Sequence, residues 1–448
     1  MSEAKKRLVV IGGGAAGFFC AVNAARLHSS LEVIILEKTT KLLSKVKVSG
    51  GGRCNVTHSC FSIPDMIRNY PRGTNFLKKA FHHFFTTDTI QWFAERGVPL
   101  KTEPDGRMFP ETNSSQSIID CLMKEANRYG VEIRMMSDVK SIKVNIDDTK
   151  PDVGEKKYEV GGKKYEDGSL EFEPVRNNEK RRFTLELADQ RFLTSDFVCI
   201  ASGGYSKPAQ FNWLQQLGHS IAEPVPSLFT FNMPGNAITQ LMGVSVPEAH
   251  IKIAGSNLSA TGPLLITHWG LSGPAVLRLS AWGARQLAIC NWQFATVINW
   301  LPDYNEHTLR EKFQQLRFDM AAQKIAVRNP FNLPQRLWQY LLQQSGIDEE
   351  KRWADLPVKE QNKLIANCCM QEFKVQGKTT FKEEFVTAGG IQLSEIEVNT
   401  MQSKVIPHLY FAGEILDVDG ITGGFNFQHA WTSGYIAAKA IAKQLECE

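Results

Sequence analysis

Residues 8–38 read LVVIGGGAAGFFCAVNAARLHSSLEVIILEK, and this stretch decides the fold. An apolar run of strand-forming residues leads directly into three glycines, and an alanine-rich helical segment follows. The glycines Gly12, Gly14 and Gly17 stand at the G-x-G-x-x-G spacing. The first permits a tight turn, the second lets the backbone approach a pyrophosphate, and the third lets helix and strand pack closely. The pattern predicts a βαβ unit that binds an anion at the helix N-terminus.

The second strand of this unit ends on an acidic residue, Glu37, which follows Gly17 by twenty positions. A carboxylate at this strand tip can accept hydrogen bonds from both ribose hydroxyls of an adenosine, and it repels a 2′-phosphate. The site is therefore expected to hold FAD or NAD rather than NADP. A glycine-rich loop in some other βαβ unit is the alternative, but it would not need the terminal acid.

Composition sets the broad class of the protein. The 448 residues are 43% hydrophobic and 22% charged, typical of a globular chain of about three domains. A net charge of +4 is small, so we expect neither a nucleic-acid nor a membrane partner. Because there is no signal-peptide pattern and no apolar run of about 18 residues, we expect a cytoplasmic protein. Nine scattered cysteines without C-x-x-C argue against a disulfide framework, a zinc site and a redox dithiol.

A second glycine-rich segment, KLLSKVKVSGGGRCN at residues 41–55, lies just beyond Glu37. Backbone amides and positive charges in such a loop could wrap phosphates or the edge of a flavin ring, whereas a solvated flexible loop is the alternative. The residues concerned are Lys45, Lys47, Ser49, Gly50, Gly51, Gly52, Arg53 and Asn55.

The alternation of strands and helices continues after this loop. Strands are predicted at residues 131–135 and 197–201, with an amphipathic helix at 116–129, which favours a parallel sheet. Val139 follows the first of these strands, where an adenine edge could meet backbone groups. Small residues at the end of the second allow close backbone approach at the carboxyl edge of the sheet, where open α/β folds bind ligands. They are Ser202, Gly203 and Gly204.

The last segment restores the pattern of the first. A strand at 409–414 ends in Gly413 and Glu414, and an alanine-rich helix is predicted at 429–444 after a glycine-rich turn. The N-terminal end of that helix would stabilise an anionic reduced flavin. Both chain ends thus build one domain, with the middle inserted.

The expected domains follow from these shifts in pattern. A polar insertion without chemistry interrupts the first part of the FAD domain, and a β-rich and a helical domain follow before the chain returns. The boundaries are 1–207 for the first part, with the insertion at 146–182, 208–302 for the β-rich domain, 303–370 for the helical domain, 371–388 for the return through the β-rich domain, and 389–448 for the second part.

Seven motifs in this order resemble the BaiN-like (YhiN-like) family of FAD-dependent oxidoreductases, some of which are called aminoacetone oxidase family proteins. They are VVIGGGAAG, SGGGRCNVT, GRMFPETNSSQSI, ASGG, THWGLSGPA, FVTAGGIQLSEI and LYFAGEILDVDGITGGFNFQHAW. The resemblance implies an α/β fold: a Rossmann-type, glutathione-reductase-like FAD-binding domain with inserted β-barrel-like and helical domains. It also implies non-covalent FAD contacted at Gly14, Ala15, Glu37, Lys38, Arg53, Asn55, Val139, Gly204, Glu414, Gly424 and Asn426.

Taken together, the candidate cofactor-binding residues come from both ends of the chain, and no metal ligands are expected. The full set is Gly12, Gly14, Ala15, Ala16, Gly17, Glu37, Lys38, Ser49, Gly50, Gly51, Gly52, Arg53, Asn55, Val139, Ser202, Gly203, Gly204, Gly413, Glu414, Gly423, Gly424, Phe425 and Asn426.

The expected activity is hydride transfer between the flavin N5 and a small organic substrate. Because no second G-x-G-x-x-G occurs, NADPH or NADH would dock transiently as electron donor, unless another donor is used. His268 in THWGLSG is the histidine to consider for catalysis, with a structural role as the alternative. Two other functions stay open: a flavin-dependent RNA-modifying enzyme and a non-catalytic flavin redox sensor. The substrate, the proton donor and the oligomeric state are left open.

Overall fold

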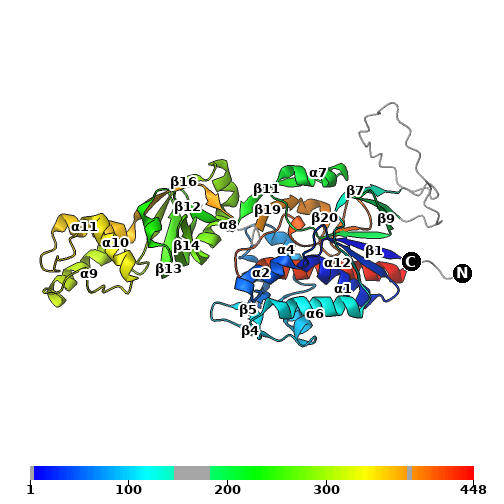
Figure 1. Cartoon of the computed structure of the whole chain (residues 1–448), viewed down its shortest axis with the longest axis horizontal. Coiled ribbons are helices and arrows are strands. Elements are labelled where there is room, and N and C mark those ends of the chain that lie inside the picture. The colour runs from blue at the N-terminus through cyan, green and yellow to red at the C-terminus, as the bar shows by residue number, and fades with distance from the viewer. Residues whose placement is uncertain (1–4, 146–181, 381–385, 448) are drawn as a thin grey trace, which may run out of the picture.

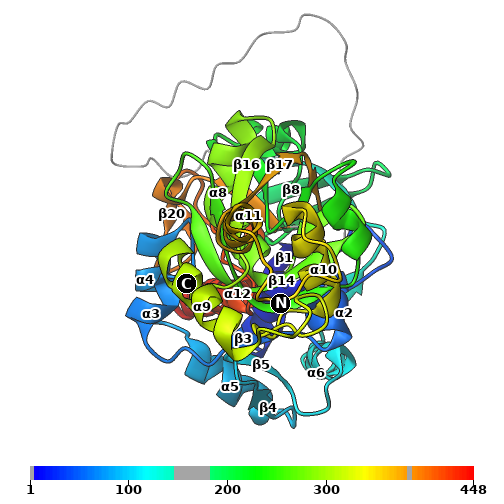
Figure 2. The same cartoon turned by 90° about the vertical axis from the view of Figure 1, so that its left-hand side faces the viewer.

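The computed structural model describes residues 5–145, 182–380 and 386–447. The insertion expected at 146–182 lies outside these residues except for Arg182, as does the part of the expected return segment at 381–385. The described chain forms three parts along one long axis: the FAD domain, a β-rich domain and a helical arm (Figure 1). In the end-on view the helical arm lies in front of the FAD domain (Figure 2).

A seven-stranded sheet forms the centre of the FAD domain, in the order β20-β21-β22-β10-β1-β2-β6. The five strands from β22 to β6 run parallel, as the βαβ pattern predicted. The sheet draws strands from both chain ends, since β22 pairs with β10 and β10 pairs with β1. The strands are β1 Arg7–Ile11, β2 Glu32–Leu36, β6 Glu132–Arg134, β10 Phe197–Ile200, β20 Ile396–Glu397, β21 Gln402–Ser403 and β22 Leu409–Phe411.

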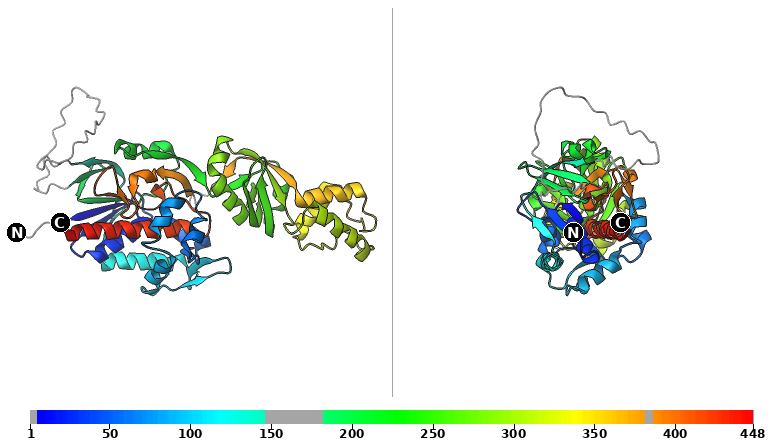
Figure 3. Two further views of the ribbon diagram at one scale, coloured as in Figure 1. Left: turned by 180° about the vertical axis from the view of Figure 1, so that it is seen from behind. Right: turned by 90° about the vertical axis from the view of Figure 1, so that its right-hand side faces the viewer.

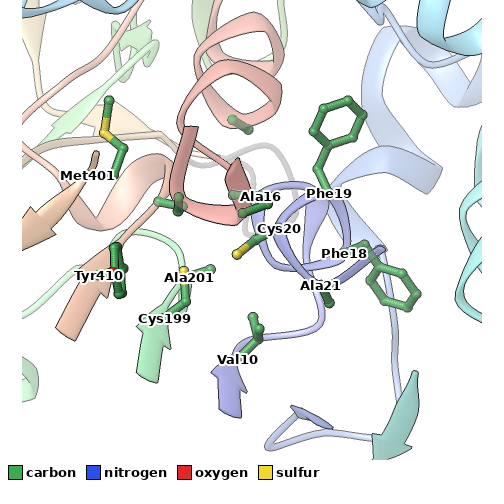
Figure 4. Packing of buried hydrophobic residues seen from close by; sticks show 14 of the residues in the cluster. Val10, Ala16, Phe18, Phe19, Cys20, Ala21, Cys199, Ala201, Met401 and Tyr410 are labelled. Carbon is green, nitrogen blue, oxygen red and sulfur yellow. The ribbon is translucent and has the colours of Figure 1, made fainter. Parts of the chain in front are cut away.

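Two helices from opposite ends of the chain pack together on one face of this sheet. They are α1 (Ala15–Leu27) and α12 (Phe425–Cys447), which lie side by side in both views of Figure 3. Glycine makes the contacts possible: a Cβ on Gly17 would lie 1.9 Å from the Gly12 carbonyl oxygen, and one on Gly434 would lie 2.7 Å from the Ala16 oxygen. Figure 4 shows Cys20 of α1 beside Cys199 of β10 in the apolar layer between helix and sheet.

Smaller elements surround the central sheet. The expected helix at 116–129 is confirmed as α6, and the aromatic region before it forms three short helices that pack into the same core. The elements are α2 Ser44–Gly52, β3 Thr57–His58, α3 Ile63–Ile67, α4 Thr74–Ala80, α5 Thr86–Ala94, β4 Leu100–Thr102, β5 Arg107–Pro110, α6 Ser115–Arg128, β7 Val139–Val144, β8 Phe183–Leu187, β9 Phe192–Ser195 and α7 Asn212–Gln216.

The segment expected as a loop at residues 41–55 is partly helical, which corrects that prediction. Helix α2 forms because Val46 is buried and the helix packs against α6. The backbone leaves the helical region at Ser49, Gly50 and Gly51, where φ is +59° and +69° at the two glycines. The glycines therefore end the helix and turn the chain back toward the sheet.

The β-rich domain is a second, antiparallel seven-stranded sheet in the order β17-β16-β13-β14-β15-β12-β18. A two-stranded ladder of β11 and β19 connects it to the FAD domain. One long helix, α8, packs against β14 and was not predicted. The elements are β11 Ile221–Ser227, β12 Thr230–Asn232, β13 Ser245–Ile253, β14 Ser259–Thr267, β15 Gly270–Ser272, α8 Pro274–Ile289, β16 Gln293–Asn299, β17 Gln371–Gln376, β18 Lys378–Thr379 and β19 Val386–Ile391.

The helical arm consists of α9 (Glu306–Asp319), α10 (Gln335–Ser345) and α11 (Val358–Cys369). Its buried side chains join those of the β-rich domain in one core, separate from the core of the FAD domain. The arm lies at the end of the molecule farthest from the FAD domain (Figure 1). In the described part of the chain, the β-rich domain therefore lies between the arm helices α9, α10 and α11 and the FAD domain. None of the described helices is long and apolar enough to cross a membrane.

Candidate functional site

Two adjoining cavities lie along the carboxyl edge of the parallel sheet. The larger, of about 490 Å³, extends from the first glycine turn to the β-rich domain. The smaller, of about 280 Å³, lies on the other side of the same turn. The two cavities share four lining residues, Gly12, Glu37, Lys38 and Ser202. The two cavities therefore form one elongated site whose middle is the glycine turn.

The glycine turn opens the middle of this site. Gly12 has φ +115°, and a Cβ there would lie 2.4 Å from the Ala201 carbonyl oxygen. A Cβ on Gly14 would meet no atom within 4 Å, so this glycine leaves open the space in front of the first turn of α1. The amide groups at that helix end have no partner within the helix and favour an anion.

Glu37 is fixed at the junction of the two cavities. Its Oε2 accepts from the Gly13 amide at 2.9 Å, and its Oε1 accepts from the Thr39 amide at 2.9 Å and the Thr39 hydroxyl at 2.8 Å. A carboxylate oxygen has further lone pairs, so Glu37 can accept from ribose hydroxyls while it stays in place.

The smaller cavity has aromatic and aliphatic side chains in its wall, against which a purine could pack. It is lined by Val139, Tyr205 and Trp213. Burial raises the pKa of the Tyr205 hydroxyl, which therefore stays neutral. The Lys38 ammonium lies 5.7 Å from the centre of the Tyr205 ring. Trp213 and Tyr205 were not predicted as site residues, because a purine pocket has no fixed sequence pattern beyond the strand that precedes it.

The turn after α2 forms one wall of the larger cavity. Ser49, Gly50 and Asn55 line it, and a Cβ on Gly50 would lie 2.7 Å from the Phe109 ring. Arg53 points elsewhere: its Nη1 donates to Glu103 Oε1 at 2.5 Å and its guanidinium stacks 4.0 Å from the Phe109 ring centre. The neighbouring Cys54 is buried, which raises the pKa of its thiol to about 12, so it remains protonated.

The last glycine-rich turn forms the opposite wall, at the N-terminal end of α12. Gly423 and Gly424 have φ of +134° and +91°, and a Cβ on Gly424 would lie 2.5 Å from the Thr57 carbonyl oxygen. The Asn426 side chain braces this turn by accepting from the Gly420 amide at 2.8 Å and donating to the Gly420 carbonyl at 2.9 Å. The helix therefore begins at Phe425, four residues earlier than predicted, and its N-terminal end adjoins the cavity.

The Glu414 side chain lies next to three segments that are far apart in the sequence, those of Lys45, Gly204 and Thr387. Its Oε2 accepts from Lys45 Nζ at 2.5 Å, and its Oε1 accepts from the Thr387 amide at 2.9 Å. Gly204 leaves room for this arrangement, because a Cβ there would lie 2.6 to 2.7 Å from Thr387 and Glu414. Gly204 thus shapes the site without lining either cavity.

His429 lines the larger cavity and was not predicted. It is buried on α12, where its Nε2–H donates to the Gly413 carbonyl at 3.1 Å, and burial lowers the pKa of its imidazole to about 4. Its Nδ1 is buried without a partner among the described residues. The Ser433 hydroxyl accepts from the Gly413 amide at 2.9 Å, so two side chains of α12 hold the peptide groups of Gly413.

The β-rich domain closes the far end of the larger cavity. The residues that line it from that side are Leu228, Thr230, Ser272, Leu277 and Val386. These residues were missed because the wall forms only when two domains meet.

His268 lies on the turn between β14 and β15, where it is exposed and stacks edge-on against Trp269 at 4.4 Å between ring centres. It lines neither cavity, so it has no contact with the site in this structure.

Most of the predicted cofactor residues meet in this one site. Those lining the larger cavity are Gly12, Gly14, Ala15, Ala16, Glu37, Lys38, Ser49, Gly50, Asn55, Ser202, Gly203, Gly413, Glu414, Gly423, Gly424 and Asn426, and Val139 lines the smaller. Those lining neither are Gly17, Gly51, Gly52, Arg53, Gly204 and Phe425.

The site fits FAD. It is elongated, has a cavity with aromatic side chains in its wall at one end, a carboxylate placed for ribose, an open glycine turn for the pyrophosphate and a second helix N-terminus at the other end. The unpartnered Nδ1 of His429 adds a buried hydrogen-bond acceptor beside the larger cavity. Among the described residues no group of three or more metal-ligating side chains is found.

Comparison with known proteins gives matches along most of the chain. Two family models match, the HI0933-like protein Rossmann domain at residues 6–164 and the HI0933-like protein barrel and H2TH domain at residues 225–386. A ribosomal RNA dihydrouridine synthase of Haemophilus influenzae is 29% identical over 446 residues, 97% of this chain and 98% of the relative. The protein of the same name from Escherichia coli is 29% identical over 444 residues, 96% of each chain. A 3-dehydro-bile acid delta(4,6)-reductase of Clostridium scindens is 25% identical over 448 residues, covering 98% of this chain and 99% of the relative.

Proposed function

Because this chain belongs to the HI0933-like protein family, we propose that it is a FAD-dependent oxidoreductase that reduces a carbon–carbon double bond conjugated to a carbonyl group. The elongated site along the sheet edge carries this proposal. It provides one place for each part of a dinucleotide, and the β-rich domain forms the wall at its far end, against which a substrate can lie.

Each part of the cofactor has its own residues. The smaller cavity takes the adenine, Glu37 takes the ribose, and the turn from Gly12 to Ala15 takes the pyrophosphate. The flavin ring then extends toward Gly424 and the N-terminal end of α12. The positive end of that helix favours negative charge on the reduced ring.

The relatives' names suggest the type of reaction. A dihydrouridine synthase saturates the C5=C6 bond of a uracil, which is conjugated to the C4 carbonyl. A delta(4,6)-reductase of a 3-dehydro-bile acid saturates double bonds conjugated to a ring ketone. In both reactions a bound reduced flavin can supply the hydride from N5, and the protein holds the acceptor against it.

We propose uridine in ribosomal RNA as the substrate. The two relatives of that name share more of the sequence with this chain than the bile-acid reductase does. Charge near the site also supports RNA: residues 38–64 contain five lysines and arginines and no acidic residue. Lys45 and Arg53 among them are paired with Glu414 and Glu103, whereas Lys38 and Lys41 line the larger cavity with no ion pair to a described residue. This proposal replaces our expectation from net charge that no nucleic acid is involved, because local charge matters more than the total.

A small unsaturated ketone is the second candidate substrate. The match to the bile-acid reductase covers 98% of this chain, and the β-rich wall of the larger cavity offers the apolar residues Leu228, Leu277 and Val386. In this alternative the substrate would lie wholly within the cavity.

The test begins with the absorption spectrum of the purified protein. Oxidised flavin bands that bleach when NADPH or NADH is added without oxygen would support a pyridine nucleotide as electron donor. The reduced protein is then mixed anaerobically with ribosomal RNA from a strain lacking this protein, or with a 3-oxo-4,6-dienoic steroid acid. Flavin reoxidation by RNA, with one nucleoside gaining the mass of two hydrogen atoms, is the expected result. A protein that takes up no FAD, or whose reduced flavin neither acceptor reoxidises, would refute the proposal.

A further inference from the structure

The wall that the β-rich domain contributes to the larger cavity faces the substrate, if the proposed function is correct. The FAD domain supplies the surfaces that hold the cofactor, so the substrate has to contact the wall that the β-rich domain supplies. Of the five residues on that side, Leu228, Leu277 and Val386 are apolar, and only Thr230 and Ser272 carry hydroxyl groups.

The Thr230 hydroxyl is already occupied. It donates to the Thr379 carbonyl at 3.2 Å and accepts from the Trp269 indole nitrogen at 3.0 Å. These bonds connect β12 with β18 and with the turn after β14, so Thr230 holds the wall together and has no proton to offer a substrate.

The Ser272 hydroxyl makes no hydrogen bond to any residue in the described ranges, although Ser272 lines the cavity and is partly buried. Its backbone is held in place, because Ser272 pairs with Leu265 in the ladder between β14 and β15. Gly273, with φ +98°, fixes the turn that follows: a Cβ there would lie 2.9 Å from Leu265 N and from the Pro263 carbonyl oxygen. A rigid backbone thus presents one free hydroxyl to the cavity.

Reduction of a conjugated double bond places negative charge on the carbonyl oxygen. When hydride adds to the carbon farther from the carbonyl, the π electrons move to the oxygen and an enolate forms. A proton from solvent water then adds to the nearer carbon, and the hydride donor is left oxidised. A donor that meets the oxygen at this stage lowers the barrier, because it binds the charged form more strongly than the neutral carbonyl.

We infer that Ser272 is a catalytic residue whose hydroxyl donates a hydrogen bond to the carbonyl oxygen of the substrate, C4=O in the case of a uracil. This inference rests on the proposed reduction but not on the choice between RNA and a small ketone, since both acceptors carry the same conjugated carbonyl.

The first test measures binding of an anion without turnover. 4-Chlorophenol bound over oxidised flavin mimics an enolate when ionised, and the phenolate gives a long-wavelength charge-transfer band. The Ser272→Ala variant should bind the phenolate about 10- to 100-fold more weakly, because a hydrogen-bond donor to the charged oxygen is lost. For the same reason the bound phenol should ionise, and the charge-transfer band should appear, only at higher pH. Ser272→Thr keeps a hydroxyl and should restore most of the binding. Ser259→Ala, at an exposed serine on β14, is the matched control and should behave as the unaltered protein.

The second test separates the steps of the reaction. With flavin reduced by dithionite, reoxidation by the unsaturated substrate should be about 100- to 1000-fold slower in Ser272→Ala, whereas reoxidation by dioxygen should not change. Equal phenolate affinity and equal substrate rates in the two proteins would overturn the role of Ser272. Failure of the unaltered protein to be reoxidised by either substrate would instead overturn the proposed function, while the phenolate comparison would still decide whether Ser272 faces the flavin.

Discussion

The buried imidazole of His429 should make the protein less stable in weak acid. In the folded chain, burial lowers the pKa of this imidazole from 6.5 to about 4. Between these values the unfolded chain binds a proton at His429 and the folded chain does not, so stability falls as the pH is lowered. Each tenfold difference in proton affinity is worth about 1.4 kcal/mol, so the loss between about pH 7.5 and about pH 4 amounts to about 3 kcal/mol from His429 alone.

His429→Gln isolates this contribution. A glutamine amide can still donate to the Gly413 carbonyl, as Nε2 does at 3.1 Å, but it does not titrate. Burial also lowers the pKa of His219 and His58, so part of the acid sensitivity should remain in the variant.

Urea unfolding at a fixed FAD concentration, followed by circular dichroism from about pH 7.5 to about pH 4, measures the effect. The free energy of unfolding of the original protein should fall by about 3 kcal/mol more than that of His429→Gln over this range. Parallel pH profiles for the two proteins would show that His429 is protonated as easily in the folded chain as in the unfolded one, and the reasoning from burial would be wrong.

Three further substitutions test the cofactor site and its support. Glu37→Gln should weaken FAD binding about 10- to 100-fold, measured by flavin fluorescence, because a charged acceptor for the ribose is lost; unchanged affinity would contradict its role. Gly17→Ala should abolish FAD binding, checked by absorbance of the purified protein, since its Cβ would lie 1.9 Å from the Gly12 oxygen; a fully yellow variant would contradict this. Arg72→Met should lower the free energy of unfolding by about 3 to 5 kcal/mol in urea titration, because it leaves the carboxylate of Asp419 buried without its ion pair, and a loss under about 1 kcal/mol would contradict the pairing.

Local patterns predicted most of the residues that the FAD domain contributes to the walls of the two cavities. The glycines of the first turn, Glu37 and the later Gly413–Glu414 pair act through backbone geometry and strand position, which neighbouring residues specify. The parallel sheet and the resemblance to a flavoprotein family followed from the same signals.

The wall that the β-rich domain contributes could not be predicted in this way. Ser272 and Thr230 become site residues only because the β-rich domain packs over the cavity, and His429 is buried only once α12 meets Gly413. His268 was predicted as a candidate because it is a histidine within a family motif. The turn between β14 and β15 that carries it leaves the ring exposed and outside both cavities.

The sequence of helix α8 does carry a helical pattern. Val276, Leu279, Gly283 and Leu287 recur at helical spacing on its buried side, and Pro274 stands at the first position, as is typical of a helix start. Gly273 before the helix and Pro274 at its first position resembled a turn within a β-rich region, and this obscured the helix.

The central sheet pairs β10 both with β1, which is made early, and with β22, which is made after the β-rich domain and the helical arm. This order has a consequence for synthesis on the ribosome, because those two inserted parts share a core of their own that can form before β22 and α12 emerge. Until residues 409–447 emerge, Gly424 and Glu414 are missing from the walls of the larger cavity, and the apolar face of α1 lacks α12 as its partner helix. A stop codon before residue 409 would therefore yield a folded arm attached to a domain that lacks these cavity walls.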